Sequence, residues 1–467
     1  MQRGPDETLR ARTADAMRAL AAWAAAAVAQ PLPADVRRRA AVILMDDLGA
    51  MVAGAAEPQV AEAAGRMLRA GGPAEAAVFA PGAPRTDRAT AAAANGMAAT
   101  WCELDEGYRG APCHAGAYLL PAMLAEAEAT GASVGDVLAA LAVAYEITTR
   151  LARAFRAPVL HLHPHAGFAT IGAAASVAAL RRHDAATLLD AVSGAASMAF
   201  AGPYGHAPEG ALVRNAWTSA GAWVGLRAAD WAEAGIGGIP ETPYDVFAVL
   251  LGHDADPAAL TNGLGEDWAV RNGYHKVFAC CQYAHAAVEA TLALRGRLPA
   301  PDAVEALEEI LVETHPLGLT LTTAEPRTVL AAKFSMPHAA ASVARLGTGG
   351  RQAFATATLH DDAIAALRRR VRLAPLAQVG APPNDRPARV TWRFRGGEEW
   401  SETCESARGG ADRPLDEGTL RAKLADNLGG LFPAMPAGLE AIVAGTPAAL
   451  AQRWGDAVAA LTAPGRA

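Results

Sequence analysis

The sequence predicts a mainly helical protein in which a smaller unit of strands and helices is inserted into a large helical domain. With 467 residues, the chain exceeds the size at which one hydrophobic core usually stops growing. Alanine-rich segments with apolar residues at helical spacing fill the chain up to Gly273, and segments with strand-like β-branched content follow. Helical patterns return from Leu415. We therefore assign residues 1–273 and 412–467 to the helical domain and residues 274–411 to an inserted α/β unit.

The helical domain begins with two helices, expected over residues 14–29 and 34–52, which Pro31 and Pro33 separate. In the second helix, one buried face is formed by Val36, Ala40, Ile43, Leu44, Leu48 and Met51. Asp46 and Asp47 lie close to this face, and we interpret them as packing or capping groups. Further helices are expected over residues 61–69, 90–100, 118–130, 134–154, 171–182, 185–199 and 211–234, with no strand between them.

The inserted unit mixes both kinds of pattern. Strands are expected over residues 307–313, 352–359, 370–373 and 390–394, and helices over 286–294 and 337–346. A proline-rich connector covers residues 375–387. The last helices are expected over residues 419–428 and 447–461, and this tail is expected to return to the first domain.

Composition excludes several classes of function. A formal charge of -7 with mixed signs leaves no basic face for nucleic acid or a membrane surface, so an anionic substrate would need a local cationic pocket. Five cysteines are few and odd in number, which indicates a reducing compartment without structural disulfides. The start lacks the apolar segment of a secretory signal, and the apolar run 19–30 is too short to cross a bilayer. A soluble, cytoplasmic protein is expected.

The loop after the predicted helix 90–100 concentrates charged residues. Glu103, Asp105, Glu106, Arg109 and His114 lie between two alanine-rich helices, in a segment punctuated by glycine and proline. A loop held by a rigid scaffold is a common way to build an active site. The alternative is a solvated surface loop, but histidine and lysine clusters elsewhere in the chain favour a functional site.

Three histidines form a second cluster. His161, His163 and His165 stand at alternate positions, and in an extended segment they would face one side, as in a metal site. No carboxylate or cysteine lies beside them, however, and Pro164 interrupts the alternation. An acid/base or substrate-binding histidine is favoured, because imidazole titrates near pH ~6.5. Metal binding and a structural role stay open.

A third cluster lies at the predicted domain junction. Lys276, Cys281 and His285 can face one cleft, since a helix is expected to begin close to His285. A thiol nucleophile needs a nearby base, and His285 stands one helical turn after Cys281. The alternative is that Cys280 and Cys281 are half-buried thiols without a role.

Arg214 lies near the start of a predicted helix. A lone arginine is usually a surface group, but its guanidinium binds carboxylates at two points, so an anion-binding role is credible. The sequence contains no Walker A loop and no glycine-rich turn between a strand and a helix. Nucleotide-dependent chemistry is therefore not supported.

Together these motifs resemble the MmgE/PrpD family, which includes 2-methylcitrate dehydratase, cis-aconitate decarboxylase and iminodisuccinate epimerase. The matching stretches follow the family order along nearly the whole chain: Asp46-Asp-Leu-Gly, Asn95-Gly96, Glu103-Leu-Asp-Glu106, His114-Ala-Gly116, Ala144-Tyr-Glu-Ile147, His163-Pro164, the segment from Lys276 to His285, and Lys333-Phe-Ser-Met-Pro337. Each motif is weak alone, and the ordered set is strong.

The resemblance implies a helical domain made from both chain ends, an inserted α/β lid, and a homodimer that works without metal or organic cofactor. It also implies an active site between helical domain and lid, lined by Glu103, His114, His163, Arg214, Lys276 and Cys281. The corresponding chemistry is proton transfer at a carbon next to a carboxylate, with loss of water or carbon dioxide, or with inversion of the carbon.

The physical logic of such chemistry assigns roles to these residues. Cations must stabilise the enolate-like charge while a base takes the proton. We assign Arg214 and Lys276 to substrate carboxylates, with Cys281 as a further catalytic group. His114 and His163 are assigned to proton transfer. The remaining predicted substrate contacts, or groups that orient a histidine, are Glu103, Asp105 and His285.

Some positions depart from the family pattern. Arg214 stands where decarboxylase-like members carry lysine, Cys281 where they carry histidine, and His338 where tyrosine is usual. The leading hypothesis is a cofactor-free lyase, either a dehydratase or a decarboxylase, that acts on a small polycarboxylate. The alternatives are an epimerase that pairs His114 with Cys281 or Lys276, a catalytically silent scaffold, and a metal hydrolase built on the three histidines.

Overall fold

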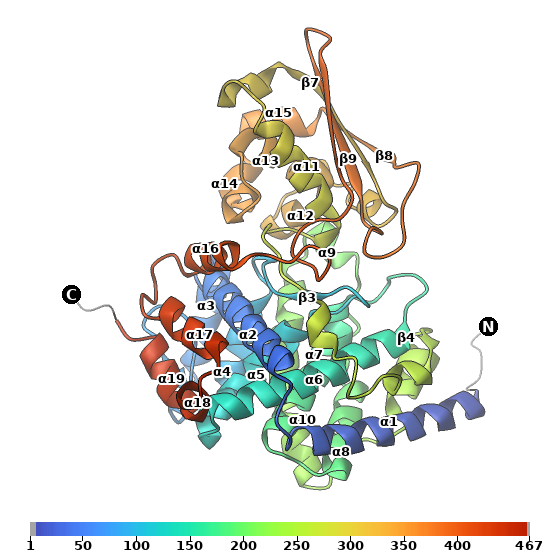
Figure 1. Cartoon of the computed structure of the whole chain (residues 1–467), viewed down its shortest axis with the longest axis vertical. Helices are drawn as coiled ribbons and strands as arrows, with labels where there is room; N and C mark the ends of the chain where they lie inside the picture. The colour runs from blue at the N-terminus through green and yellow to red at the C-terminus, as the bar shows by residue number, and fades with distance from the viewer. Residues whose placement is uncertain (1–5, 465–467) are drawn as a thin grey trace.

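The computed structural model describes residues 6–464 and shows a large helical body with a smaller lobe of strands and helices on top of it (Figure 1). One cluster of buried apolar side chains fills the helical body, and a second fills the smaller lobe and extends into the adjoining part of the body. The chain is therefore mainly helical, with one small mixed sheet. Within residues 6–464, no helix combines the length and apolar character that a membrane span requires.

The first segment of the chain forms most of the helical body. Its α-helices are α1 (Glu7–Ala27), α2 (Ala34–Ala55), α3 (Pro58–Leu68), α4 (Arg88–Ala99), α5 (Ala115–Thr130), α6 (Val134–Ala154), α7 (Pro164–Leu180), α8 (Ala185–Ser197), α9 (His206–Glu209) and α10 (Ala216–Glu233). Local signals fix several ends: Ser133 and Asp136 form a capping box at α6, and Asp6, Asp87 and Asp184 cap α1, α4 and α8. The predicted helices are thus largely confirmed.

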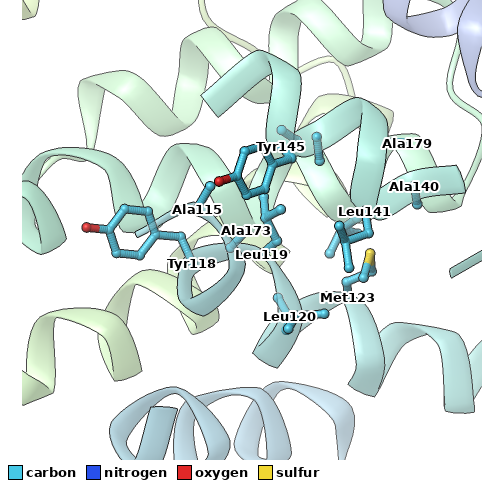
Figure 2. Close-up of a cluster of buried hydrophobic side chains, with 14 of the residues drawn as sticks. Ala115, Tyr118, Leu119, Leu120, Met123, Ala140, Leu141, Tyr145, Ala173 and Ala179 are labelled. Carbon is cyan, nitrogen blue, oxygen red and sulfur yellow. The ribbon is translucent and has the colours of Figure 1, made fainter. Parts of the chain in front are cut away.

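The centre of this body consists of α5, α6, α7 and α10. Figure 2 shows Leu119, Leu120, Met123 and Leu141 among the apolar side chains that fill the space between them. Alanine and glycine let the helices come close, since an added Cβ at Gly225 of α10 would collide with Ala173 of α7. The alanine-rich composition is therefore used for tight helix packing.

The smaller lobe contains a four-stranded sheet in the order β10–β9–β7–β8. Its strands are β7 (Leu307–Thr314), β8 (Val371–Pro375), β9 (Ala388–Phe394) and β10 (Glu399–Cys404), and only β7 and β8 run parallel. The helices are α11 (His285–Arg295), α12 (Val329–Lys333), α13 (Met336–Leu346), α14 (Thr356–Leu359) and α15 (Asp362–Arg368). Of these, α11 packs against β9 and β10.

The C-terminal helices pack on the helical body, as the sequence predicts. They are α16 (Glu417–Leu428), α17 (Met435–Ala444), α18 (Pro447–Ala451) and α19 (Trp454–Leu461). Both α16 and α17 contact α2, and α19 contacts α5 and α6. Lys423 of α16 fixes this return, because its Nζ donates to the Leu104 carbonyl at 2.7 Å and lies 2.5 Å from Oδ1 of Asp46.

Some predicted elements differ from the structure. Residues 352–359 were expected as a strand but form a 3-10 turn, Arg351–Phe354, and helix α14, since burial of Phe354 is satisfied equally well by a helical turn. The tail 447–461 is two helices that turn at Gln452. Strand β10 and helix α17 were not predicted. Six two-residue strands, which form three antiparallel pairs, also interrupt the body, where no strand was expected. They are β1 (Ala76–Ala77) with β2 (Arg85–Thr86), β3 (Gly107–Tyr108) with β6 (Gly273–Tyr274), and β4 (Phe155–Arg156) with β5 (Asp254–Ala255).

Candidate active site

A small cavity of about 50 Å³ lies between the helical body and the lobe that carries the sheet. Six predicted site residues line it: Glu103, His114, His163, Arg214, Lys276 and Cys281. They come from four separate segments of the chain: the loop between α4 and α5, the start of α7, the turn before α10, and the segment after Tyr274. The tertiary structure therefore brings together the residues that the sequence separates.

Pairing of β3 with β6 positions the acidic loop. Gly107 pairs with Tyr274 and Tyr108 with Gly273, so the loop after α4 runs beside the segment that carries Lys276. The backbone of Glu103 has a φ of 55°, which residues other than glycine rarely adopt. This conformation persists because both carboxylate oxygens of Glu103 meet buried cations.

Glu103 joins the two cations of the site. Its Oε1 lies 2.5 Å from Nη2 of Arg214, and its Oε2 lies 3.2 Å from Nζ of Lys276. Burial alone would raise the pKa of Glu103, but the charges of Arg214 and Lys276 outweigh burial and lower it. For Lys276, burial opposes the charged form, yet Asp105 and Glu103 raise its pKa. Lys276 therefore stays an ammonium ion and cannot act as a base at neutral pH.

Asp105 orients His114 from behind the cavity. Oδ2 of Asp105 lies 2.7 Å from Nδ1 of His114, and Oδ1 lies 3.5 Å from Nζ of Lys276. Burial would raise the pKa of Asp105, but the nearby Lys276 and His114 lower it, so it remains a carboxylate. The Nε2 atom of His114 has no hydrogen-bond partner among residues 6–464. A carboxylate on one ring nitrogen with the other nitrogen free is the arrangement of an oriented general base.

His163 caps the N-terminus of α7, and two donors meet its ring. The backbone N–H of His165 donates to Nδ1 at 3.1 Å, and Nε of Arg214 donates toward Nε2 at 3.2 Å. A neutral imidazole has one acceptor nitrogen, so only one of these two contacts is a hydrogen bond in that state. A protonated ring would have no acceptor at all, so both donors oppose protonation of His163. Burial and the charge of Arg214 hold the pKa of His163 well below its usual range. This histidine is therefore neutral.

Cys281 lines the cavity from the lobe of strands and helices. Burial raises the pKa of its thiol to about 12. At neutral pH the group is a thiol rather than a thiolate, which removes the basis for a nucleophilic cysteine.

Other predicted residues lie elsewhere. Both ring nitrogens of His285 are engaged behind the cavity, with the Tyr274 hydroxyl at 2.7 Å and the Cys280 carbonyl at 3.2 Å, so His285 cannot serve as the base for Cys281. His161 is exposed, whereas His163 and His165 are buried. The rings of His163 and His165 lie 4.5 Å apart between centroids, so only His161 is separated from the other two. Among the described residues, no three side chains are placed to hold a metal ion.

A second buried network supports the acidic loop. Oδ1 of Asp47 accepts from the Glu106 backbone N–H at 2.6 Å, and the Tyr145 hydroxyl donates to the Glu106 carboxyl. Burial raises the pKa of Glu106 to about 8 and also raises that of Asp47. Asp46 instead pairs with His275 and Lys423. As the sequence suggested for Asp46 and Asp47, these carboxyls support the loop rather than line the cavity.

Sequence reasoning missed several cavity residues. The additional lining side chains include Tyr108, Tyr204, Gln282, Tyr283, Phe334 and Arg386. Arg386 belongs to the stretch that was predicted only as a proline-rich connector. An arginine beside Asp385 in that connector was the available signal, but only the fold places it at the cavity. Conversely, His338 lies inside the smaller lobe, beside Arg368 and Thr358.

Comparisons with known proteins agree with this architecture. Residues 18–255 match the MmgE/PrpD N-terminal domain, and residues 278–445 match the MmgE/PrpD C-terminal domain. The chain is 25% identical over 426 residues to the cis-aconitate decarboxylase-like protein oryM of Aspergillus oryzae, which covers 86% of this chain and 88% of the relative. It is 27% identical over 299 residues to the cis-aconitate decarboxylase of Aspergillus terreus, which covers 59% of each chain.

Proposed function

Because the chain belongs to the MmgE/PrpD family, we propose that it is a lyase that acts on a small polycarboxylate by proton transfer next to a carboxylate. Two of its relatives carry names that refer to cis-aconitate decarboxylase, which acts on such an acid. The observation that carries the proposal is the Asp105–His114 pair, whose free ring nitrogen lies in the same cavity as Arg214 and Lys276. One cavity thus contains a base and two cations.

The arrangement divides the reaction between these groups. Arg214 and Lys276 bind substrate carboxylates and lower the energy of the enolate-like charge that develops on them. In a dehydration, Nε2 of His114 takes the proton from carbon, the released electron pair forms the double bond, and hydroxide leaves with a proton as water. In a decarboxylation, the C–C bond to a carboxylate breaks instead, and a protonated group returns a proton to the carbon.

His163 is the proposed second proton carrier. Arg214 and Lys276 are among the causes of its lowered pKa, so a bound dianion that neutralises their charge raises the pKa again. Burial remains the largest cause of the lowered pKa, so substrate binding would make His163 a stronger base without cancelling the effect of burial.

The epimerase alternative is supported by one observation. Cys281 is a protonated thiol in the same cavity as His114, and it comes from the opposite lobe. A base on one side and a proton donor on the other is what inversion of a carbon requires. Lys276 is less suited to this second role, because its carboxylate partners hold it charged.

Proton NMR in deuterium oxide tests the proposal. The purified chain is incubated with citrate, 2-methylcitrate, cis-aconitate, malate and iminodisuccinate. A new vinylic signal, or loss of a carboxylate with deuterium in the product, supports the lyase. Deuterium uptake without net loss of substrate supports the epimerase. If wild type and His163→Ala give identical spectra across the panel, the assignment of this cavity as a catalytic site is wrong.

A further inference from the structure

A second cavity of about 680 Å³ lies directly outside the small one. Six residues line both and form the throat between them: Tyr108, Pro112, Leu160, Pro164, Tyr283 and Arg386. Small-molecule sites commonly have volumes of ~300–1,000 Å³. The outer cavity therefore has the size of a ligand site, and it opens on the residues assigned to chemistry.

The inner cavity is too small for a whole substrate. The space open to water in it is about 50 Å³, which is room for a few water molecules. A carboxylate and the reacting carbon can displace them, whereas the rest of a substrate molecule must extend through the throat. The chemistry of the outer walls then decides which substrates are favoured.

One part of the outer cavity wall is apolar. Phe155 and Phe168 contribute aromatic rings, and Leu162 and Leu317 contribute aliphatic side chains. Phe155 and Phe168 both stack on Phe247, at centroid distances of 5.4 and 5.2 Å, so their rings are held in place. A fixed apolar wall favours hydrocarbon over water by removing apolar surface from solvent.

The charged groups of the outer cavity are largely occupied by one another. Nη2 of Arg109 lies 2.5 Å from Oδ1 of Asp385 and donates to the Pro383 carbonyl at 2.9 Å. Arg156 donates to the Gly110 carbonyl at 2.9 Å. Arg386 lies 3.4 Å from Asp385 and stacks on Tyr283, and its buried Nε has no hydrogen-bond partner within residues 6–464. Arg386 at the throat thus lies beside the inner cavity with a buried Nε that makes no hydrogen bond among the described residues.

From this arrangement we propose that the outer cavity is a specificity site for a hydrocarbon arm, so that the preferred substrate is a polycarboxylate carrying an alkyl chain. The arm lies against Phe155, Phe168 and Leu162, while Arg386 contacts a carboxylate at the throat. The inference rests on the proposed function, because it places the polycarboxylate end of the substrate in the inner cavity.

Binding of saturated analogues tests the inference independently of turnover. Propane-1,2,3-tricarboxylate and its 1-methyl, 1-butyl and 1-hexyl derivatives lack the reactive bond arrangement, and titration calorimetry on the full chain gives their Kd values. Burial of a methylene contributes up to a fourfold gain in affinity, about 0.8 kcal/mol. We expect Kd to fall by up to about fourfold per added methylene. A Kd independent of chain length overturns the inference.

A pair of variants locates the effect. Ala157 lines the outer cavity and not the inner one, so Ala157→Phe should abolish the gain from the butyl and hexyl arms and leave the unsubstituted acid unaffected. Val159→Phe adds the same ring two residues away, at a side chain that is 60% exposed and outside this cavity, and should behave as wild type. If the Kd of Ala157→Phe still falls with alkyl chain length, the arm does not bind in this cavity.

The two proposals fail in different ways. If short acids are turned over in the NMR assay but Kd does not depend on chain length, the lyase proposal stands and the alkyl-site proposal is wrong. If long-chain analogues bind tightly but no acid or alkylated acid is turned over, the alkyl-site proposal stands and the lyase proposal is wrong. Failure of both binding and turnover removes both.

Discussion

Oδ2 of Asp105 lies 2.7 Å from Nδ1 of His114, although Asp105 is fully buried behind the cavity and only His114 lines it. The short loop between α4 and α5 supplies both residues, and pairing of β3 with β6 fixes that loop. The pair thereby presents one ring nitrogen to the cavity in a fixed orientation.

Replacement of the base should remove most of the turnover. His114→Gln is expected to lower kcat by ~10²–10⁴, the usual contribution of a general base. Asp105→Asn should lower kcat with little change in KM, because Asp105 orients the ring without lining the cavity. Steady-state kinetics separate the two effects. A large rise in KM for Asp105→Asn would mean that this residue binds substrate directly.

Arg214 should act mainly on substrate binding. Arg214→Ala is expected to raise KM, but it also leaves Glu103 buried beside a single cation, which can cost about 3–5 kcal/mol of stability. The double variant Glu103→Gln with Arg214→Met removes both charges and is the matched control for folding. If the double variant is folded and binds tricarboxylates as wild type does, Arg214 is not a substrate contact.

Cys281 distinguishes the lyase from the epimerase. Its thiol, with a pKa of about 12, is neither a nucleophile nor a base at neutral pH. Cys281→Ala should therefore retain most of the kcat of a lyase, whereas a two-base epimerase would lose ~10²–10⁴ of its rate. Product analysis with chiral substrates checks the outcome. A large loss of rate in a confirmed lyase would show that the thiol delivers a proton.

Glu106 should make the folded state less stable as pH rises. Its pKa moves from an ordinary value of 4.5 to about 8 on folding, so the folded state holds an extra proton between these values. The free energy of unfolding therefore falls as pH increases through this window. Glu106→Gln keeps an acceptor for Tyr145 and cannot ionise, so its stability relative to wild type should increase from pH 5 to pH 8. Thermal unfolding at both pH values measures this, and a difference that shrinks with pH would contradict it.

Lys423 should stabilise the packing of the C-terminal helix α16 against the helical body and the acidic loop. Lys423→Met removes the cation that lies 2.5 Å from Asp46 and the donor to Leu104, at a position only 6% exposed. Loss of one member of a buried ion pair costs about 3–5 kcal/mol. Arg421→Met on the same helix changes a side chain that is 56% exposed and should cost less than about 1 kcal/mol. Urea unfolding compares the stability of the two variants. An equal loss of stability would show that the Lys423–Asp46 pair contributes no more than a surface ion pair.

Much of the candidate site could be predicted from the sequence. Six of the eight predicted residues line the inner cavity, and Asp105 contacts two of them, His114 and Lys276. These residues could be named because histidine, lysine and arginine in short glycine-rich or proline-bounded segments mark chemistry locally, and because the ordered motifs resemble the family; their roles stay predictions. It was wrong in placing His285 at the cavity, because the direction of that side chain depends on Tyr274 and the Cys280 carbonyl.

The sequence by itself determined the helical class, the order of the helices, the return of the C-terminal segment and membership of the family. Periodicity and capping residues act over a few positions, so they can be read without the fold. Only the tertiary structure decided which charges neutralise one another. The Glu103, Arg214 and Lys276 cluster, the neutral state of His163 and the position of Arg386 at the throat depend on burial and on contacts between distant segments. The ionisation of a buried group depends on all the charges around it, and these come from distant parts of the sequence, so a local sequence pattern does not predict it.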